Sequence, residues 1–73
     1  MIKIYGKEGC NKCVILCKIL DNKKIKYNYI DIHEEENKDS YEMLYDLNIM
    51  TLPVVEKDSE ITSDYNKIIK MFK

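Results

Sequence analysis

A chain of 73 residues, 45% of them hydrophobic and 34% charged, suffices for one small globular domain over residues 1–73 and is too apolar for a disordered chain. Twelve basic against thirteen acidic residues leave a net charge of −1, so no electrostatic field favours binding to nucleic acid. With no leader pattern and no long apolar run, the sequence predicts a cytoplasmic protein that does not enter a membrane, and we expect a monomer.

The first half of the chain alternates between strand and helix patterns. Residues 2–5 ("IKIY") alternate as a strand does, and residues 6–9 follow as a loop. Residues 11–20 place apolar side chains at i, i+3, i+4 and i+7, which predicts a helix. Residues 25–32 ("IKYNYIDI") are rich in Ile and Tyr and predict a second strand. Such a strand–helix–strand unit forms a right-handed parallel crossover.

A second helix is expected within residues 33–49. Asp39 and Glu42 resemble a capping box at its start, and Asn48 suits a left-handed residue at its end. The positions expected to face inward are Tyr41, Leu44 and Tyr45. Most of the chain's six tyrosines are interpreted as core residues with hydrated hydroxyls.

The last third of the chain predicts a hairpin followed by a helix. A short strand follows the only proline in residues 50–58, and Asp58-Ser59 turns into a brief strand at 60–62. Residues 64–73 carry the final helical pattern. The element order is therefore β-α-β-α-β-β-α, which predicts an α/β fold with a four-stranded mixed sheet and helices on both faces.

Two cysteines stand where the first loop meets the first helix. A thiol reacts as its thiolate, which is favoured at a helix N-terminus, beside cations, and in a Cys-x-x-Cys pair. Cys10 meets all three conditions, because Lys7 and Lys12 flank it. In a reducing compartment this spacing favours redox or metal chemistry over a structural disulfide. We expect Cys10 to attack a disulfide and Cys13, about one helical turn later, to resolve the mixed disulfide.

Cys17 extends the pair to C-x2-C-x3-C and leaves a second class of function open. Three soft thiolates could hold Cu(I) or Zn(II), so a small metal-binding module is the alternative. The helix expected at the end of the chain fits poorly with the β-α-β-β-α-β order of small copper chaperones. Cys17 itself lies on the apolar stripe and is interpreted as a core residue. His33, alone in an acidic turn, is expected to be exposed, and we expect no metal ligands.

Four stretches, "YGKEGCNKC", "YIDI", "LNIMTLPVV" and "ITSDYNKII", together resemble a glutaredoxin, and more closely a short glutaredoxin-like redoxin of the NrdH type. The resemblance covers nearly the whole chain. It implies a thioredoxin fold and a thiol-disulfide oxidoreductase that reduces protein disulfides or mixed disulfides of glutathione, with ribonucleotide reductase as a candidate substrate. A thioredoxin-like adaptor without turnover is a further alternative, which the intact Cys10, Cys13 and Pro53 argue against.

The resemblance also implies roles outside the cysteine pair. It places Pro53 after a cis bond facing the cysteines, where a substrate backbone can pair with Leu52 as an added strand. In glutathione-dependent members, residues matching Lys7 and the helix cap Ser63-Asp64 hold the tripeptide. Simple solvation of Lys7 and simple capping by Ser63 or Asp64 remain equally open. The implied substrate-binding or glutathione-binding residues are Lys7, Lys12, Thr51, Leu52, Pro53, Ser63 and Asp64.

The sequence departs from the family pattern at several positions. Asn11-Lys12 replaces the familiar Pro-Tyr within the pair, and Gly6 stands where Ser or Thr is usual. Ile61-Thr62 replaces a Gly pair before the last helix, and a tryptophan-containing segment common in NrdH members is missing. These departures leave two electron donors open, glutathione and a flavoprotein thioredoxin reductase. No bound cofactor is expected.

Overall fold

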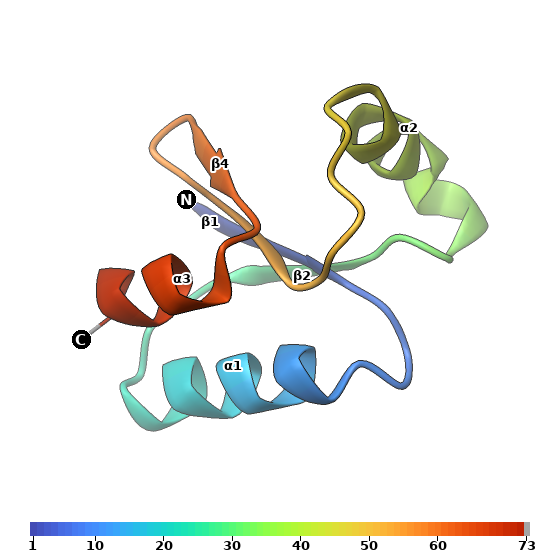
Figure 1. Ribbon diagram of the computed structural model, residues 1–73. Helices are drawn as coiled ribbons and strands as arrows, with labels where there is room; N and C mark the ends of the chain where they lie inside the picture. The colour runs from blue at the N-terminus through green and yellow to red at the C-terminus, as the bar shows by residue number, and fades with distance from the viewer. Residues whose placement is uncertain (73) are drawn as a thin grey trace.

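The chain folds into a four-stranded sheet with helices on both faces, in a computed structural model that describes residues 1–72 (Figure 1). The predicted order β-α-β-α-β-β-α is confirmed, with one short 3-10 helix added. The elements are β1 (Ile2–Gly6), α1 (Asn11–Asn22), β2 (Asn28–Asp31), η1 (Glu35–Asn37), α2 (Lys38–Asp46), β3 (Val54–Lys57), β4 (Glu60–Thr62) and α3 (Tyr65–Met71). Within this described part, no helix has the length and apolar character needed to cross a membrane. The predicted end of the last helix, residue 73, lies outside the described residues.

The sheet has the order β2-β1-β3-β4 and is mixed, as predicted. β1 and β2 are parallel and are joined through α1, whereas β1–β3 and β3–β4 are antiparallel. Asp58 and Ser59 link β3 to β4 with φ values of 50° and 69°. Two successive positive φ angles are typical of the tight hairpin turn whose twist matches that of the flanking strands.

Alternation along the central strands builds one core on each face of the sheet. Ile4 and Tyr5 point to opposite faces, as do Val55 and Val54, because successive side chains alternate along a strand. The cluster under α1 and α3 consists of Ile4, Leu16, Leu20, Val55, Ile68 and Phe72. The cluster under α2 consists of Tyr5, Leu44 and Val54. Figure 1 shows α1 and α3 on one side of the sheet and α2 on the other.

Two helices end in the same way, which shortens the second strand relative to the prediction. Lys24 and Asn48 both have φ of 59°, and the amides that follow them bond back to Leu20 and Leu44. This is the Schellman arrangement, in which a left-handed residue closes the helix. The prediction for Asn48 is confirmed. Because the closure of α1 extends to Ile25, pairing of β2 begins only at Asn28 and not at residue 25.

The predicted start and inward face of the second helix are wrong. α2 is preceded by η1 and has Asn37 at its N-cap with no side-chain hydrogen bond, so Asp39 lies inside the first turn and forms no capping box. Tyr41 and Tyr45 are 46% and 71% exposed, and only Leu44 is buried. Tyr29 is also largely exposed, so the expectation that most tyrosines are core residues fails as well. On α2, Leu44 alone is buried against the sheet, and Tyr41 and Tyr45 line an open groove.

The burial pattern predicts unequal effects of the same substitution in two helices. Ile68 of α3 is fully buried, whereas Ile15 of α1 is 49% exposed. We expect Ile68→Val to lower the free energy of unfolding by about 1 kcal/mol, because it leaves a methyl-sized cavity. The matched control Ile15→Val should change it by less than about 0.5 kcal/mol. Urea denaturation followed by circular dichroism measures both, and equal losses would contradict the assigned burial.

Candidate active site

The junction between β1 and α1 places Cys10 at the start of a helix. After β1 ends at Gly6, the chain makes one turn in which the Cys10 amide donates to the Lys7 carbonyl at 3.3 Å. Gly9 has φ of +84°, a conformation that favours glycine, and so permits the tight turn. Cys10 is then the N-cap of α1, with extended φ and ψ of −88° and 103°. The predicted location at the helix start is confirmed.

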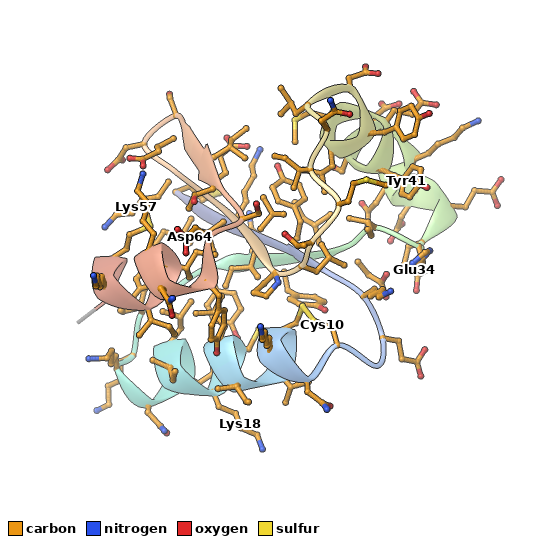
Figure 2. All side chains as sticks on the ribbon, in the orientation of Figure 1. Cys10, Lys18, Glu34, Tyr41, Lys57 and Asp64 are labelled. Atoms are coloured by element: carbon orange, nitrogen blue, oxygen red, sulfur yellow. A yellow bond between two sulfur atoms is a disulfide. The ribbon has the colours of Figure 1, made fainter. Side chains whose placement is uncertain are left out.

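The two cysteines of the pair are joined by a disulfide, seen as the yellow bond beside the Cys10 label in Figure 2. Their Cα atoms are 5.3 Å apart, within the usual range for such a bridge. The Cys13 amide donates to the Cys10 sulfur at 3.2 Å. Cys13 is 1% exposed, whereas Cys10 is only partly buried. The pair therefore has an outer sulfur that a partner can reach and an inner sulfur that it cannot.

The two flanking lysines lie in different surroundings. The Lys12 ammonium sits over the ring of Tyr65, 5.3 Å from its centroid, which is a cation–π contact between the start of α1 and the start of α3. Lys7 is exposed and lines a groove on the α2 side of the molecule. Tyr65 also packs against the core cluster under α1 and α3, and the sequence did not indicate its contact with Lys12.

The segment before β3 lies at the same end of the sheet as Cys10. β1 and β3 are antiparallel with Tyr5 opposite Val54, so the residues before Val54 adjoin the end of β1. The peptide bond between Leu52 and Pro53 is cis. Pro53 is buried, Leu52 is half-buried and Thr51 is exposed. Both Leu52 and Thr51 therefore retain surface that a partner can contact.

Asp64 acts as the N-cap of α3, and Ser63 does not. The Asp64 carboxylate accepts hydrogen bonds from the amides of Asn66 and Lys67 at 3.1 and 3.3 Å. The Asp64 amide in turn donates to the Thr62 hydroxyl at 3.2 Å. Two amides at this helix start therefore already have a partner within the chain, which is the capping role that the sequence left open.

Cys17 lies one turn beyond the pair and remains a free thiol. Burial raises its pKa, an effect that a hydrogen bond with Tyr27 opposes and the charge of Asp21 reinforces. The Tyr27 hydroxyl donates to the Asp21 carboxylate at 3.0 Å. Within residues 1–72, no group of three Cys, His, Asp or Glu side chains has an arrangement that could hold a metal ion.

An open groove lies between α2 and the segment before β3. It has a volume of about 420 Å³, and its lining includes Lys7, His33, Tyr41, Tyr45 and Leu52. His33 is exposed, as predicted, and its ring centroid is 6.4 Å from that of Tyr41. Figure 2 shows Tyr41 on α2, on the other side of the sheet from α1. Sequence reasoning assigned both tyrosines to the core and therefore missed this groove.

Tyr29 on β2 is a further neighbour of the pair that sequence reasoning missed. A Cβ atom added to Gly6 would lie 2.5 Å from the Tyr29 hydroxyl oxygen and 3.0 Å from the Cys13 sulfur. The absence of a side chain at Gly6 thus leaves room for both groups. A glycine inside a strand is a sequence signal of such a close approach, although it does not say which residue approaches.

These features define a class of protein. A mixed sheet of this order, with a Cys-x-x-Cys pair at the start of the first helix, is the architecture of the thioredoxin-fold redoxins. The family model for glutaredoxin matches residues 2–61, and the chain therefore belongs to the glutaredoxin family. The match ends before Ser63 and Asp64.

Solved structures with the same fold include the glutaredoxin-like NrdH-redoxin of Escherichia coli, with a TM-score of 0.79 and 21% identity over 96% of this chain and 92% of that one. A thioredoxin-like protein aligns over 100% of both chains with a TM-score of 0.78 and 22% identity. The glutaredoxin of Archaeoglobus fulgidus has a TM-score of 0.74 and 20% identity, covering 99% of this chain and 85% of that one. At these identities the likeness shows the fold alone. A search among curated proteins finds no match.

The sulfur geometry predicts how many thiols react with iodoacetamide. Unfolded without a reductant, the oxidised protein should be alkylated only at Cys17, whereas after reduction all three cysteines should react. In the folded, reduced protein, Cys17 should react slowly at neutral pH and faster as the pH rises, because its raised pKa keeps the thiol protonated. Intact mass and peptide mapping measure both effects. Alkylation of all three cysteines without reduction would rule out the bridge.

Proposed function

We propose that the protein is a dithiol thiol-disulfide oxidoreductase that reduces disulfides in protein substrates and acts in the cytoplasm as a monomer. The observation that carries the proposal is the unequal exposure of two bonded sulfurs at a helix start. Cys10 is accessible and accepts a hydrogen bond from the Cys13 amide, whereas Cys13 is buried behind it. An adaptor or a metal carrier has no need for an inner sulfur that only its neighbour can reach.

The reaction consists of two thiol–disulfide exchanges. The Cys10 thiolate attacks one sulfur of the substrate disulfide, and the other substrate sulfur leaves as a thiolate. The Cys13 thiolate then attacks the Cys10 sulfur, which forms the internal disulfide and releases the second substrate thiolate. The Cys13 amide, which donates to the Cys10 sulfur, is placed to stabilise the anion at Cys10 before attack. Two electrons thus pass from the protein to the substrate.

Residues before β3 are proposed to align the substrate chain. Leu52 is half-buried next to the buried Pro53, and its backbone can pair with an extended substrate segment. Thr51 belongs to the same segment. The groove lined by Lys7 and Leu52 continues from this segment toward α2. We propose that it receives apolar side chains next to the substrate cysteine, and that ribonucleotide reductase is one candidate substrate.

The electron donor is proposed to be a flavoprotein reductase of the thioredoxin reductase type. Glutathione would bring its γ-glutamyl carboxylate to the start of α3, where free amides would bind it. Here the Asp64 carboxylate already accepts from two of those amides, and the Thr62 hydroxyl accepts from the Asp64 amide.

Single substitutions of the three cysteines should have three different results. Cys10→Ser should abolish the reduction of a protein disulfide such as that of insulin. Cys13→Ser should accumulate a mixed disulfide at Cys10, because the resolving sulfur is missing. Cys17→Ser should keep turnover within about twofold of the parent, because Cys17 takes no part in the exchange. Turnover assays and mass spectrometry of trapped species measure this, and loss of turnover on removing Cys17 alone would refute the assignment.

The two candidate donors should support turnover unequally. We expect kcat/KM with NADPH and thioredoxin reductase to exceed that with glutathione and its reductase by about tenfold or more, the effect of losing one or two charge-assisted hydrogen bonds. Asp64→Gly should narrow the gap, because it frees the Asn66 and Lys67 amides while glycine remains an acceptable cap.

Asp58→Gly, in the turn between β3 and β4, is the matched control for the loss of one charge. It should leave the ratio of the two efficiencies unchanged. A parent protein that uses glutathione as efficiently as the reductase would contradict the proposed donor and leave the dithiol reaction intact.

A further inference from the structure

Position 6 is occupied by glycine because the space beside the Cys13 sulfur leaves no room for a side chain there. Gly9 is the glycine with a positive φ, whereas Gly6 has an ordinary strand conformation that any residue can adopt. A Cβ at Gly6 would nevertheless lie 2.5 Å from the Tyr29 hydroxyl oxygen and 3.0 Å from the Cys13 sulfur. Both atoms therefore occupy the same small region over the end of β1 and lie close to each other.

The sheet register explains how a residue of β2 reaches the cysteine pair. Tyr29 pairs with Ile4, and residues opposite each other in a sheet point to the same face. Ile4 faces α1, so the Tyr29 ring lies on the α1 face and extends toward Gly6. Two residues earlier, just before β2 begins, Tyr27 also packs on the α1 side and contacts Cys17.

Two tyrosines thus face two cysteines along α1. Two residues of strand span about 6.6 Å and four residues of helix span about 6 Å, so the spacing of Tyr27 and Tyr29 matches that of Cys17 and Cys13. The disulfide occupies Cys13, and Cys17 is the free thiol of the two. The Tyr29 hydroxyl, which lies on the same side of Gly6 as the inner sulfur, is therefore the one that bears on the exchange reaction.

The Tyr29 hydroxyl carries its proton at neutral pH. Burial raises its pKa, and the negative charge of Asp31 on β2 raises it further. At neutral pH the phenol is therefore a hydrogen-bond donor and cannot act as a base. A donor placed beside a buried sulfur favours the thiolate of that sulfur over the thiol.

We propose that Tyr29 donates a hydrogen bond to the Cys13 sulfur whenever the bond between Cys10 and Cys13 is open. The inference rests on the proposed dithiol function and assigns to it a further residue. In the resolving step the Cys13 thiol first loses its proton to water, and the Tyr29 hydroxyl stabilises the resulting anion. That anion attacks the Cys10 sulfur, the bond from Cys10 to the substrate breaks, and the substrate leaves as a thiolate. Tyr29 keeps its own proton throughout.

The same hydrogen bond assists the reverse direction. When a reductase thiolate attacks the Cys10 sulfur of the oxidised protein, the bond to Cys13 breaks and Cys13 leaves as a thiolate. A thiolate stabilised by a donor leaves faster, because leaving ability in thiol–disulfide exchange rises as the pKa of the leaving thiol falls. Removal of the Tyr29 hydroxyl should therefore slow both the formation and the reduction of the disulfide between Cys10 and Cys13.

Titration of Cys13 alone tests the proposal without requiring turnover. In a Cys10→Ser, Cys17→Ser background, the Cβ carbon resonance of Cys13 reports its ionisation as the pH is raised. Tyr29→Phe should move the midpoint upward by about one pH unit, the size expected for one hydrogen bond to a thiolate. The matched control Tyr27→Phe, two residues earlier in the chain, should leave the midpoint within about 0.3 units of the background.

The rate of resolution gives a second readout. The mixed disulfide of Cys10 with a chromogenic aromatic thiol releases that thiol when Cys13 attacks. At pH values below the midpoint of Cys13, Tyr29→Phe should slow the release about threefold. The fraction of Cys13 present as thiolate falls about tenfold, and the greater intrinsic nucleophilicity of a thiolate with a higher pKa offsets part of that loss. Tyr27→Phe should not slow it. This measurement follows a single turnover, so its result does not depend on the electron donor or on the natural substrate.

Gly6→Ala provides an independent variant if Tyr29→Phe destabilises the fold. The added Cβ would lie 2.5 Å from the Tyr29 hydroxyl oxygen, which is too close for both atoms, so it should displace the donor and raise the Cys13 midpoint in the same direction. An unchanged midpoint in folded Tyr29→Phe, verified by circular dichroism, would overturn the proposal. A parent protein that never releases the aromatic thiol would instead refute the dithiol function, and the titration would still decide the role of Tyr29.

Discussion

The position of one sulfur at the start of α1 is the constraint on which the rest of the structure depends. Cys10 is the N-cap because β1 ends at Gly6 and a single turn separates strand from helix. There the Cys13 amide donates to the Cys10 sulfur, so the helix backbone itself holds the reactive atom. A longer or shorter turn would move Cys10 away from these amides and separate it from Cys13.

The central place of β1 explains how so short a chain supports this junction. β1 pairs with both β2 and β3, and its residues Ile4 and Tyr5 belong to the core clusters on opposite faces. A domain of this size buries only about 60% of its unfolded surface, so few residues carry the stability. The strand that delivers Cys10 is thus also the strand whose burial stabilises the fold.

Features that depend on a few neighbouring residues could be predicted, and those that depend on remote partners could not. The Asp58-Ser59 turn, the left-handed Asn48 and the cap at the last helix all follow from local backbone preferences. The predicted inward face of α2 was wrong, because Tyr41 has helical spacing but lines an open groove, and Leu44 alone is buried. Spacing shows which residues share a face, and the packing partner decides whether that face is buried.

The same distinction between local and remote contacts applies to the site. The sequence alone determined the pairing of Cys10 with Cys13, since two residues three apart at a helix start are brought together by the helix itself. Only the tertiary structure decided that the Tyr29 hydroxyl lies beside the inner sulfur and that the Lys12 ammonium lies over an aromatic ring of α3. These contacts join separate strands and helices. They depend on strand register, helix placement and side-chain length together, and the local spacing of residues in the sequence encodes none of these.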